Sequence, residues 1–320
     1  MNKILITGGA GFIGSHLVDQ LIETHQIWVI DNLSMGVMAN LPNHKNLTFI
    51  YGDICDKALL SKLLCSHKFD YIFHLAAIAN VQDSVMEPIK THQVNFEATL
   101  TLLDLIKKEQ PTLKRLVFAS SAAVYGDLEE LPKKESSSVL PKTPYAIDKY
   151  AAERFVLSYF SLYNVPTSAV RFFNVYGPRQ NPTSTYSGVI SIITNKLKNN
   201  KEKNNKEKKE TFTVYGTGQQ TRDFIYVKDV VQSLILVSKS EKSLGEVYNI
   251  GSGEQISLNR LIKTYTSLTG LSLNLTFETK RDGDIQDSYA SITKLKSLGF
   301  KQTIDLKTGL NEYWQATFQK

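Results

Sequence analysis

The sequence predicts an α/β protein with a doubly wound parallel sheet, followed by a smaller C-terminal α/β lobe. Short buried-strand patterns alternate with helical patterns as far as about Arg171, which is typical of a parallel sheet covered by helices on both faces. Polar or small residues follow the ends of these strand patterns. Beyond Arg171 the alternation fails. We therefore expect one domain over residues 1–173, with part of 222–250 returning to it, and a second lobe over 174–320.

The composition is that of an ordinary soluble globular protein. The chain has 320 residues, of which 42% are hydrophobic and 21% charged. The apolar start of the chain is too short for a signal-peptide core, and no run of 18 apolar residues is found elsewhere. Cys55 and Cys65 suggest no disulfide framework and no metal site. We expect a cytoplasmic protein with no membrane partner and no metal.

The net charge of +6 is concentrated in one tract. Residues 195–210 carry seven Lys and three Glu, so the rest of the chain has a net charge of about +2. Such a balance is not the basic surface of a nucleic-acid-binding protein. The tract itself is typical of a solvated helix end or a loop, and we expect no nucleic-acid partner.

A glycine-rich turn follows the first strand pattern, Lys3–Thr7, and precedes a helical pattern that begins near Ser15. It reads Gly9-x-Gly11-x-x-Gly14, the spacing that lets a backbone approach a pyrophosphate at a helix N-terminus. Taken alone it could be an ordinary turn. The next strand pattern ends in Asp31, where a carboxylate can hold the ribose hydroxyls and would repel a 2′-phosphate. Together these features predict a Rossmann-type NAD site and favour NAD over NADP.

The remaining strand patterns place polar or small residues at one edge of the sheet. The strands are expected at Leu47–Ile50, Tyr71–Phe73, Leu116–Phe118 and Thr167–Arg171, with helices such as Asn95–Lys107 and Tyr145–Tyr163 between them. Each residue that follows a strand could be a simple loop or cap residue. Ligands of such sheets bind outside the carboxyl ends of the strands, so their shared placement predicts a site.

Tyr145 and Lys149 are the candidate chemical groups. Four residues apart on a helix, their side chains would lie on one face, about 5–6 Å apart at their Cβ atoms. An ammonium beside a phenol favours the phenolate. Ser121, after the strand pattern Leu116–Phe118, would bring a hydroxyl to the same crevice. The alternative is an ordinary exposed helix. It becomes less favoured only because the glycine turn predicts a bound NAD, which can accept a hydride.

Two arginines in the C-terminal half lie among polar neighbours. Arg222 and Arg281 could grip a diphosphate, because the guanidinium fork matches phosphate oxygens. The alternative is two surface ion pairs. In this lobe we expect a strand at Glu246–Ile250 and a helix at Leu258–Thr269.

In combination these residues resemble the extended short-chain dehydrogenase/reductase family, specifically its NAD-dependent nucleotide-sugar 4-epimerases, of the kind that act on UDP-glucose or UDP-N-acetylglucosamine. The resemblance runs from residue 1 to about 300. Its motifs are Thr7-Gly-Gly-Ala-Gly-Phe-Ile-Gly14, Asp31-Asn-Leu-Ser34, Gly52-Asp-Ile54, His74-Leu-Ala-Ala77, Ser120-Ser121, Tyr145-x-x-x-Lys149, Arg171-Phe-Phe-Asn-Val-Tyr-Gly-Pro178, Arg222-Asp223 and Arg281-x-Gly-Asp284.

The resemblance implies roles for individual residues. Tyr145 would be the catalytic base, Lys149 would hold the nicotinamide ribose and lower the tyrosine pKa, and Ser121 would hydrogen-bond the reacting hydroxyl. The NAD-binding residues would be Gly8, Gly11, Phe12, Ile13, Gly14, Asp31, Asn32, Ser34, Gly36, Asp53, Ile54, Leu75, Ala76, Ala77, Asn95, Tyr145 and Lys149. The residues that bind the sugar nucleotide would be Ser84, Ser121, Asn174, Val189, Tyr215, Arg222, Arg281, Asp284 and Ser288.

The residues after Ser121 narrow the reaction. Dehydratases of this family carry an acidic pair there, and the decarboxylating branch has a glutamate at the second position, whereas this chain has Ala122 and Ala123. Simple epimerisation of a UDP-sugar is what remains. A 4-keto reductase, a UDP-glucuronate 4-epimerase or a dehydratase stays an alternative of the same family. A non-catalytic NAD-binding regulator is an alternative of another class, and Tyr145→Phe would discriminate it.

Two further expectations concern the substrate and assembly. Related epimerases that are strict for UDP-glucose and UDP-galactose have a tyrosine where this chain has Ser288, so we expect room for a 2-acetamido group. UDP-N-acetylglucosamine and UDP-N-acetylgalactosamine are the expected pair, alongside UDP-glucose and UDP-galactose. The resemblance also implies a homodimer, through the helices near Asn95–Lys107 and Tyr145–Tyr163.

Overall fold

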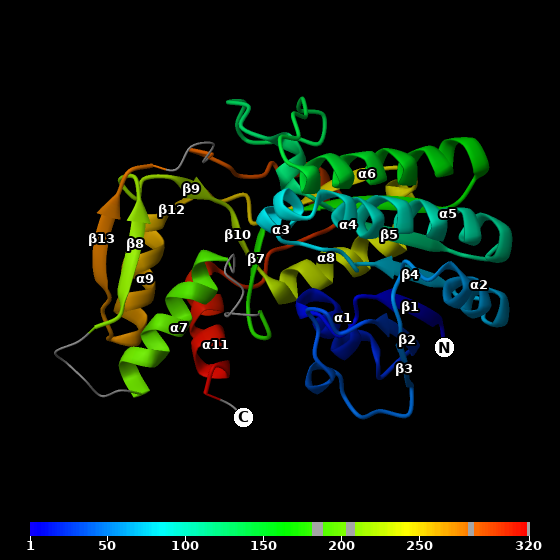
Figure 1. The fold of residues 1–320 in the computed structure, drawn as a ribbon, viewed down its shortest axis with the longest axis horizontal. Coiled ribbons are helices and arrows are strands. Elements are labelled where there is room, and N and C mark those ends of the chain that lie inside the picture. Colours follow the sequence, from blue (N-terminus) through cyan, green and yellow to red (C-terminus); the bar gives the residue numbers. More distant parts are fainter. Residues whose placement is uncertain (181–187, 203–208, 281–284, 319–320) are drawn as a thin grey trace.

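The computed structural model describes residues 1–180, 188–202, 209–280 and 285–318. Its centre is a seven-stranded sheet (Figure 1). The strands are β1 (Lys3–Thr7), β2 (Gln26–Asp31), β3 (Leu47–Tyr51), β4 (Tyr71–His74), β5 (Arg115–Ser121), β6 (Thr167–Phe172) and β11 (Val247–Ile250). Their order is β11-β6-β5-β4-β1-β2-β3, and all neighbours are parallel. The order reverses between β1 and β4, which is where such sheets bind their ligands.

Helices cover both faces of this sheet. On one face lie α1 (Phe12–Leu21) and α8 (Val227–Lys239), and on the other lie α2 (Lys57–Ser66), α5 (Ala98–Glu109) and α6 (Pro144–Tyr163) (Figure 1). Each face has its own buried hydrophobic core. Because the strands are buried on both sides, they read as continuous apolar runs rather than as alternating patterns.

Shorter elements shape the connections at the carboxyl end of the sheet. The chain passes from β4 through α3 (Val81–Met86), α4 (Pro88–His92) and a π-helical turn, η2 (Gln93–Glu97), directly into α5. The helix that the sequence placed at Asn95–Lys107 therefore starts as a π-helical turn. Three 3₁₀ turns also occur in the described residues: η1 (Met38–Asn40), η3 (Ala122–Tyr125) and η4 (Glu241–Ser243).

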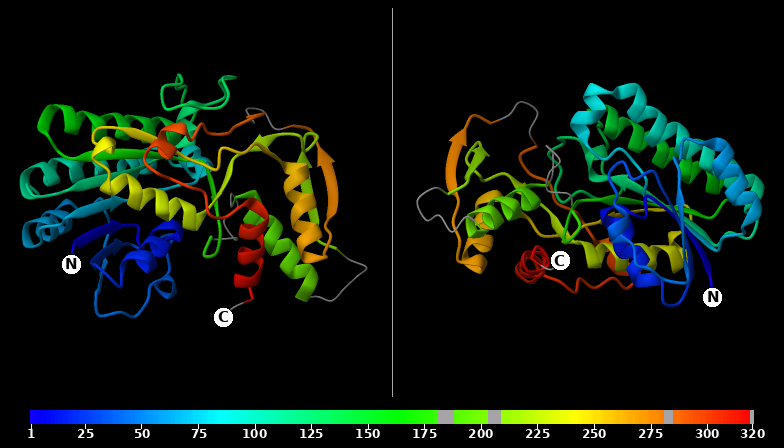
Figure 2. Two further views of the ribbon diagram at one scale, coloured as in Figure 1. Left: turned by 180° about the vertical axis from the view of Figure 1, so that it is seen from behind. Right: turned by 60° about the horizontal axis from the view of Figure 1, so that its bottom comes forward.

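A second lobe lies beside the sheet and has a core of its own (Figure 2). It contains α7 (Val189–Glu202), α9 (Leu258–Thr269) and α11 (Leu306–Ala316), and three strand pairs: β8 (Thr211–Tyr215) with β13 (Asn274–Glu278), β7 (Asn174–Tyr176) with β10 (Phe224–Tyr226), and β9 (Thr221–Arg222) with β12 (Ile256–Ser257). A last short helix, α10 (Thr293–Ser297), contacts β11. The Lys/Asn-rich tract forms the end of α7 as far as Glu202, and residues 203–208 lie outside the described part. The predicted fold class is confirmed.

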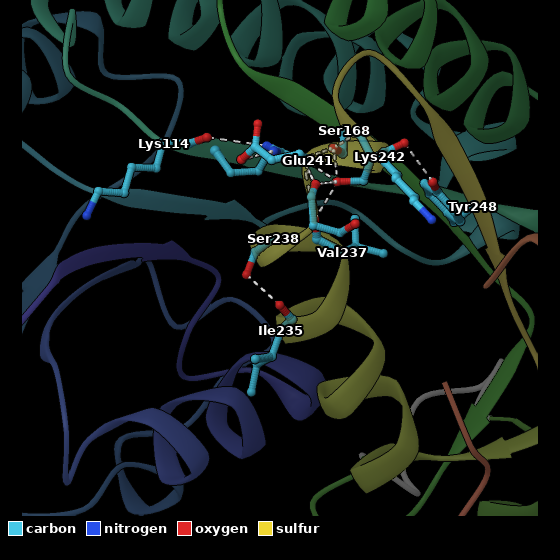
Figure 3. A network of polar contacts seen from close by, with 11 residues as sticks. Lys114, Ser168, Ile235, Val237, Ser238, Glu241, Lys242 and Tyr248 are labelled. Atoms are coloured by element: carbon cyan, nitrogen blue, oxygen red, sulfur yellow. Dashed lines mark hydrogen bonds and ion pairs between the residues drawn. The ribbon is translucent and has the colours of Figure 1, made fainter. Parts of the chain in front are cut away.

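Buried polar contacts fasten α8 and β11 to the sheet. Arg115, 1% exposed at the start of β5, donates from Nη1 to the carbonyls of Val237 and Ser240 at the end of α8. The last carbonyls of a helix lack intrahelical partners, and a guanidinium satisfies them well. Figure 3 shows the surrounding contacts, including the bond from the Tyr248 hydroxyl to the carbonyl of Lys242. Among the described residues, no helix has both the length and the apolar character that a membrane span would need.

Candidate active site

The glycine-rich turn after β1 leaves room only for backbone. Gly8 has a φ of +71°, and a Cβ there would lie 2.8 Å from the amide nitrogen of Ala76. A Cβ on Gly14 would lie 2.3 Å from the carbonyl oxygen of Gly8. Helix α1 begins at Phe12 with Gly11 as its N-cap, and no side chain of the described residues caps it. Its first N–H groups are therefore available to an anion such as a pyrophosphate.

Asp31 ends β2 beside this turn. One of its carboxylate oxygens accepts from the amide of Ala10 at 3.0 Å, and the other accepts from the amide of Leu33 at 2.8 Å. Each carboxylate oxygen can accept a second hydrogen bond. The side chain is 8% exposed. The backbone thus orients a carboxylate that still has acceptor capacity for a ribose diol.

The predicted adenosine side of the site is built from loops after β2 and β3. Asn32 Nδ2 donates to Asp53 Oδ2 at 2.9 Å, and the amide of Cys55 donates to Asp53 Oδ1 at 2.8 Å. Burial by itself would raise the pKa of Asp53, but these hydrogen bonds outweigh it and the pKa is lowered. Asp53 is therefore an anion at neutral pH.

Other predicted NAD residues contribute mainly shape. A Cβ on Gly36 would lie 2.7 Å from the carbonyl carbon of Ala10, so this loop packs closely on the glycine turn. Ser34 is exposed, and Phe12 and Ile13 are partly buried. Ile54 is 6% exposed and belongs to the core, so its side chain packs inward.

The loop after β4 is held from both sides. His74 Nδ1 lies 2.7 Å from Thr7 Oγ1, and its Nε2 lies 3.0 Å from Thr99 Oγ1. Burial and, to a smaller extent, the charge of Lys149 together lower the pKa of His74 to about 3, so the ring is neutral. Asn95, 1% exposed, bonds both the N–H and the C=O of Ile78 at 2.9 Å. These contacts fix the partly buried residues Leu75, Ala76 and Ala77 against the glycine turn.

Ser121, Tyr145 and Lys149 come together at the carboxyl end of β5. Ser121 is the last residue of the strand, and Tyr145 and Lys149 lie on the first turns of α6. Proline at the first helical position and Thr143, whose hydroxyl accepts from the amide of Ala146, start this helix. Lys149 is 3% exposed, and its Nζ donates to the carbonyl of Ala119 at 2.8 Å.

The ionisation of this group differs from the sequence expectation. Burial raises the pKa of Tyr145 above its ordinary value, and a hydrogen bond with Ser121 offsets only part of this rise. Burial also lowers the pKa of Lys149 to about 7. The ammonium points to Ala119, so Ser121 is the side chain that directly assists ionisation of the phenol in this structure.

The predicted sugar-nucleotide residues cluster at the junction with the second lobe. Arg222, in β9, donates from Nη1 to the carbonyl of Thr221 at 2.8 Å, and the amide of Ser288 donates to the same carbonyl at 3.2 Å. Asn174 is exposed in β7 and donates to the carbonyl of Asp223 at 3.1 Å. The structure therefore brings Arg222, Ser288 and Asn174 to one region.

The remaining predicted substrate-binding residues differ in how deeply they are buried. Val189 begins α7 and Tyr215 ends β8, both partly buried. Ser84 is fully buried, and its hydroxyl donates to the carbonyl of Val81 in its own helix. Arg281 and Asp284 lie outside the described residues. The binding roles of all these residues remain predictions.

The sequence did not predict that three acidic residues around the site are buried and held by hydrogen bonds or ion pairs. Asp223 accepts from the amides of Ser252, Gly253 and Ala290 and from the Ser252 hydroxyl. Glu153, on α6, pairs with an arginine of β6, and Asp148 pairs with a histidine of α4. A carboxylate next to a motif residue, as in Arg222-Asp223 or Asp148-Lys149, was a visible signal. Its partners, distant in sequence, were not.

Comparison with known proteins places this site in a family. The family model described as "NAD dependent epimerase/dehydratase family" matches residues 4–251. A putative UDP-glucose 4-epimerase of Methanocaldococcus jannaschii is 36% identical over 96% of this chain and 95% of its own.

Solved structures agree with this match. A UDP-N-acetylglucosamine 4-epimerase from Methanobrevibacter ruminantium, in complex with UDP-N-acetylmuramic acid, is 39% identical with a TM-score of 0.91, covering 99% of this chain and 98% of that one. A UDP-glucose 4-epimerase from Thermotoga maritima with UDP-glucose is 34% identical with a TM-score of 0.90, covering 98% of both chains. The predictions of an NAD cofactor and of an NAD-dependent nucleotide-sugar epimerase are confirmed by these likenesses. The chain belongs to the NAD-dependent epimerase/dehydratase family.

Proposed function

We propose that the protein is a 4-epimerase of UDP-sugars that interconverts UDP-N-acetylglucosamine and UDP-N-acetylgalactosamine, and also UDP-glucose and UDP-galactose. The observation that carries this proposal is the end of β5. Ser121 lies within hydrogen-bonding reach of Tyr145, and the 3₁₀ turn η3 that follows begins with Ala122 and Ala123. Tyr145 and Ser121 can transfer a proton at one hydroxyl of the sugar. Ala122 and Ala123 provide no carboxyl group for elimination or decarboxylation.

In the proposed epimerisation, residues of this chain transfer one proton. Tyr145 Oη accepts the proton of the sugar 4-hydroxyl, and Ser121 Oγ steadies the oxygen that loses it. A bound NAD would supply reversible hydride chemistry at carbon 4, so that the sugar could lose the hydride from one face and regain it on the other. Tyr145 then gives its proton back to the 4-oxygen, so atoms and electrons balance over the cycle. We propose that Arg222 and Asn174 hold the diphosphate while the sugar turns over.

The N-acetylated pair is favoured by the small side chain at position 288. Backbone bonds fix this segment on both sides: the amide of Ser288 donates to Thr221, and the carbonyl of Tyr289 accepts from the amide of Lys133. Successive side chains of an extended segment point to opposite sides, so Ser288 and Tyr289 face different environments. The likeness to a UDP-N-acetylglucosamine 4-epimerase supports the same substrate.

The test is incubation of purified protein with a panel of UDP-sugars and no added NAD. Interconversion of the N-acetylated pair is expected, and turnover of UDP-glucose without that of the N-acetylated pair would contradict the substrate proposal. Ser288→Tyr should reduce turnover of UDP-N-acetylglucosamine more than that of UDP-glucose. Ser297→Tyr, the same change at an exposed position of α10, is the matched control.

The same panel separates the alternatives. A 4-keto reductase would consume reduced nicotinamide cofactor and release it in the oxidised form, so it would need a supply of the reduced form. A UDP-glucuronate 4-epimerase would act on the acidic sugar, and a dehydratase would release a 4-keto-6-deoxy product. A non-catalytic regulator would turn over none of these sugars and would keep its biological activity in Tyr145→Phe.

We further propose a homodimer formed through α5 and α6. Large apolar side chains of α6 remain exposed, namely Ile147 at 50%, Phe155 at 41% and Leu162 at 68%. Their spacings of eight and seven residues place them on one helical face. Such a stripe beside α5 is suited to pairing with its own copy.

A further inference from the structure

One acidic residue stands inside the Tyr145-x-x-x-Lys149 motif and has no part in the proposed chemistry. Asp148 precedes Lys149 on α6, and its side chain is 7% exposed. Its Oδ1 lies 2.7 Å from His92 Nδ1, whereas its buried Oδ2 has no hydrogen-bond partner among the described residues. A half-satisfied buried carboxylate costs free energy. We therefore expect a positive charge close to Asp148 on α6, the helix that also carries Lys149.

His92 holds this carboxylate from outside. It is the last residue of α4, its side chain is 46% exposed, and its ring stacks on Phe96 with centroids 5.0 Å apart. Helices α4 and α6 pack against each other. The His92–Asp148 pair therefore joins α4 to α6 at the residue that directly precedes Lys149.

Other charged groups lie on the elements that pack against α6. Glu97 of η2 lines the same shallow hollow between α4 and α6, and it is exposed. Lys90 of α4 is paired with Glu87, Lys108 of α5 is paired with Asp104, and Glu153 of α6 is paired with Arg171 of β6. Asp83 of α3 is exposed, and His74 of β4, whose pKa is affected by the charge of Lys149, is neutral. Asp148 is the carboxylate whose charge acts on Lys149.

We propose that Asp148, held by His92, is a positioning residue that keeps the catalytic ammonium of Lys149 charged in its buried site. The inference rests on the proposed function, because it concerns the same tyrosine and lysine. It assigns His92 and Asp148 to the site although neither is placed to touch substrate.

The electrostatics give the proposal a sign. Burial lowers the pKa of Lys149 to about 7, and the negative charge of Asp148 opposes that fall. Without this charge the pKa of Lys149 falls further, so the lysine loses its proton at a lower pH. The cation that favours the tyrosinate is then lost at a lower pH as well, and the alkaline limit of activity moves down.

The experiment measures kcat/KM for a UDP-sugar against pH in Asp148→Asn and in the wild type. An opposite charge nearby shifts a pKa by about one unit or more. We therefore expect the alkaline limb to move down by about one pH unit from its position near pH 7, which gives a roughly tenfold loss above the limb and little change near pH 5. His92→Leu should move the limb in the same direction, and His92→Gln, which keeps a donor, should restore it. Glu97→Gln removes a carboxylate of the same hollow and should leave the limb in place.

A structural role gives a different pattern. If Asp148→Asn lowers activity equally at every pH, or lowers only the melting temperature, the proposal is wrong. A second readout does not need turnover: the ultraviolet difference between each variant and its Tyr145→Phe partner reports tyrosinate at that position. If the wild type turns over no UDP-sugar but Asp148→Asn still shifts this titration, the proposed function fails and the charge coupling stands. An unshifted titration overturns the coupling.

Discussion

At the scale of single residues, burial and hydrogen bonding act in opposite directions on the proposed base. Burial raises the pKa of Tyr145, and Ser121 lowers it. A free tyrosine has a pKa of about 10, so half ionisation at neutral pH requires a shift of about 3 units, or roughly 4 kcal/mol. One hydroxyl does not supply that much. Positive charge beside the phenol is therefore a requirement of the proposed chemistry, and it makes the charge state of Lys149 decisive.

Removing the phenolic oxygen tests this directly. Tyr145→Phe keeps the ring and its packing but leaves no acceptor for the 4-hydroxyl proton. Because general acid–base groups contribute roughly 10²–10⁴-fold, we expect a loss of that order in kcat for UDP-sugar epimerisation. NAD content and melting temperature should match the wild type. Activity within a fewfold of the wild type would remove Tyr145 from the chemistry.

The glycine turn offers a test of cofactor binding. In Gly14→Ala the new Cβ would lie 2.3 Å from the Gly8 carbonyl oxygen, so the turn must shift. We expect NAD content, measured after acid extraction, to fall by at least tenfold. Ser15→Ala adds no atom to the next position of the same helix and serves as the control. Full NAD retention in Gly14→Ala would show that pyrophosphate does not depend on this turn.

At the scale of elements, a buried ion pair ties α6 to the sheet. Arg171 of β6 makes two bonds to Glu153, Nε at 2.9 Å and Nη2 at 2.6 Å, and the hydroxyl of Ser120 donates to the same carboxylate at 2.6 Å. Glu153 lies one turn after Lys149, and Ser120 precedes Ser121. The helix and the strand that carry the candidate catalytic residues are thus joined through one carboxylate.

Breaking this pair should cost stability. Glu153→Gln leaves Arg171 charged and buried, and removal of one partner of a buried pair costs about 3–5 kcal/mol. We expect a loss of that size in the free energy of unfolding from urea titration. Asp104→Asn removes one partner of an exposed pair with Lys108 and should cost under about 0.5 kcal/mol. Equal effects of the two changes would refute this reading.

The elements themselves were largely predictable, and their cross-connections were not. The helix expected at Leu258–Thr269 is found with the same bounds, because the signals that form a helix are local. Glu153 and Arg171 are 18 residues apart, and His92 and Asp148 are 56 apart. Local patterns carry no information about which strand a helix packs on. Likewise the sequence predicts Ser84 as a substrate-binding residue, and it does not reveal that the buried Ser84 hydroxyl donates to the carbonyl of Val81 in its own helix.

At the scale of the whole molecule, the exposed stripe on α6 predicts the assembly state. Leu162→Asp places a charge within a buried apolar contact if two copies pair there, and an unpaired buried charge is strongly unfavourable. We expect a dimer mass for the wild type and a monomer mass for this variant in light scattering after size exclusion. Phe277→Asp changes an equally exposed apolar residue of β13 and should leave the dimer intact. A wild-type monomer would exclude the homodimer.

The path of the chain between the sheet and the second lobe has a consequence for expression and aggregation. After β6 the chain enters the lobe, returns as α8 and β11, and leaves again, so the edge of the sheet beside β6 is completed by residues 247–250. A fragment that stops at residue 173 would expose the hydrogen-bonding edge of β6 and the apolar residues that α8 covers. Exposed edge strands recruit other chains. We therefore expect fractionation of a lysate to recover residues 1–173 alone in the insoluble fraction and the full chain in the soluble fraction.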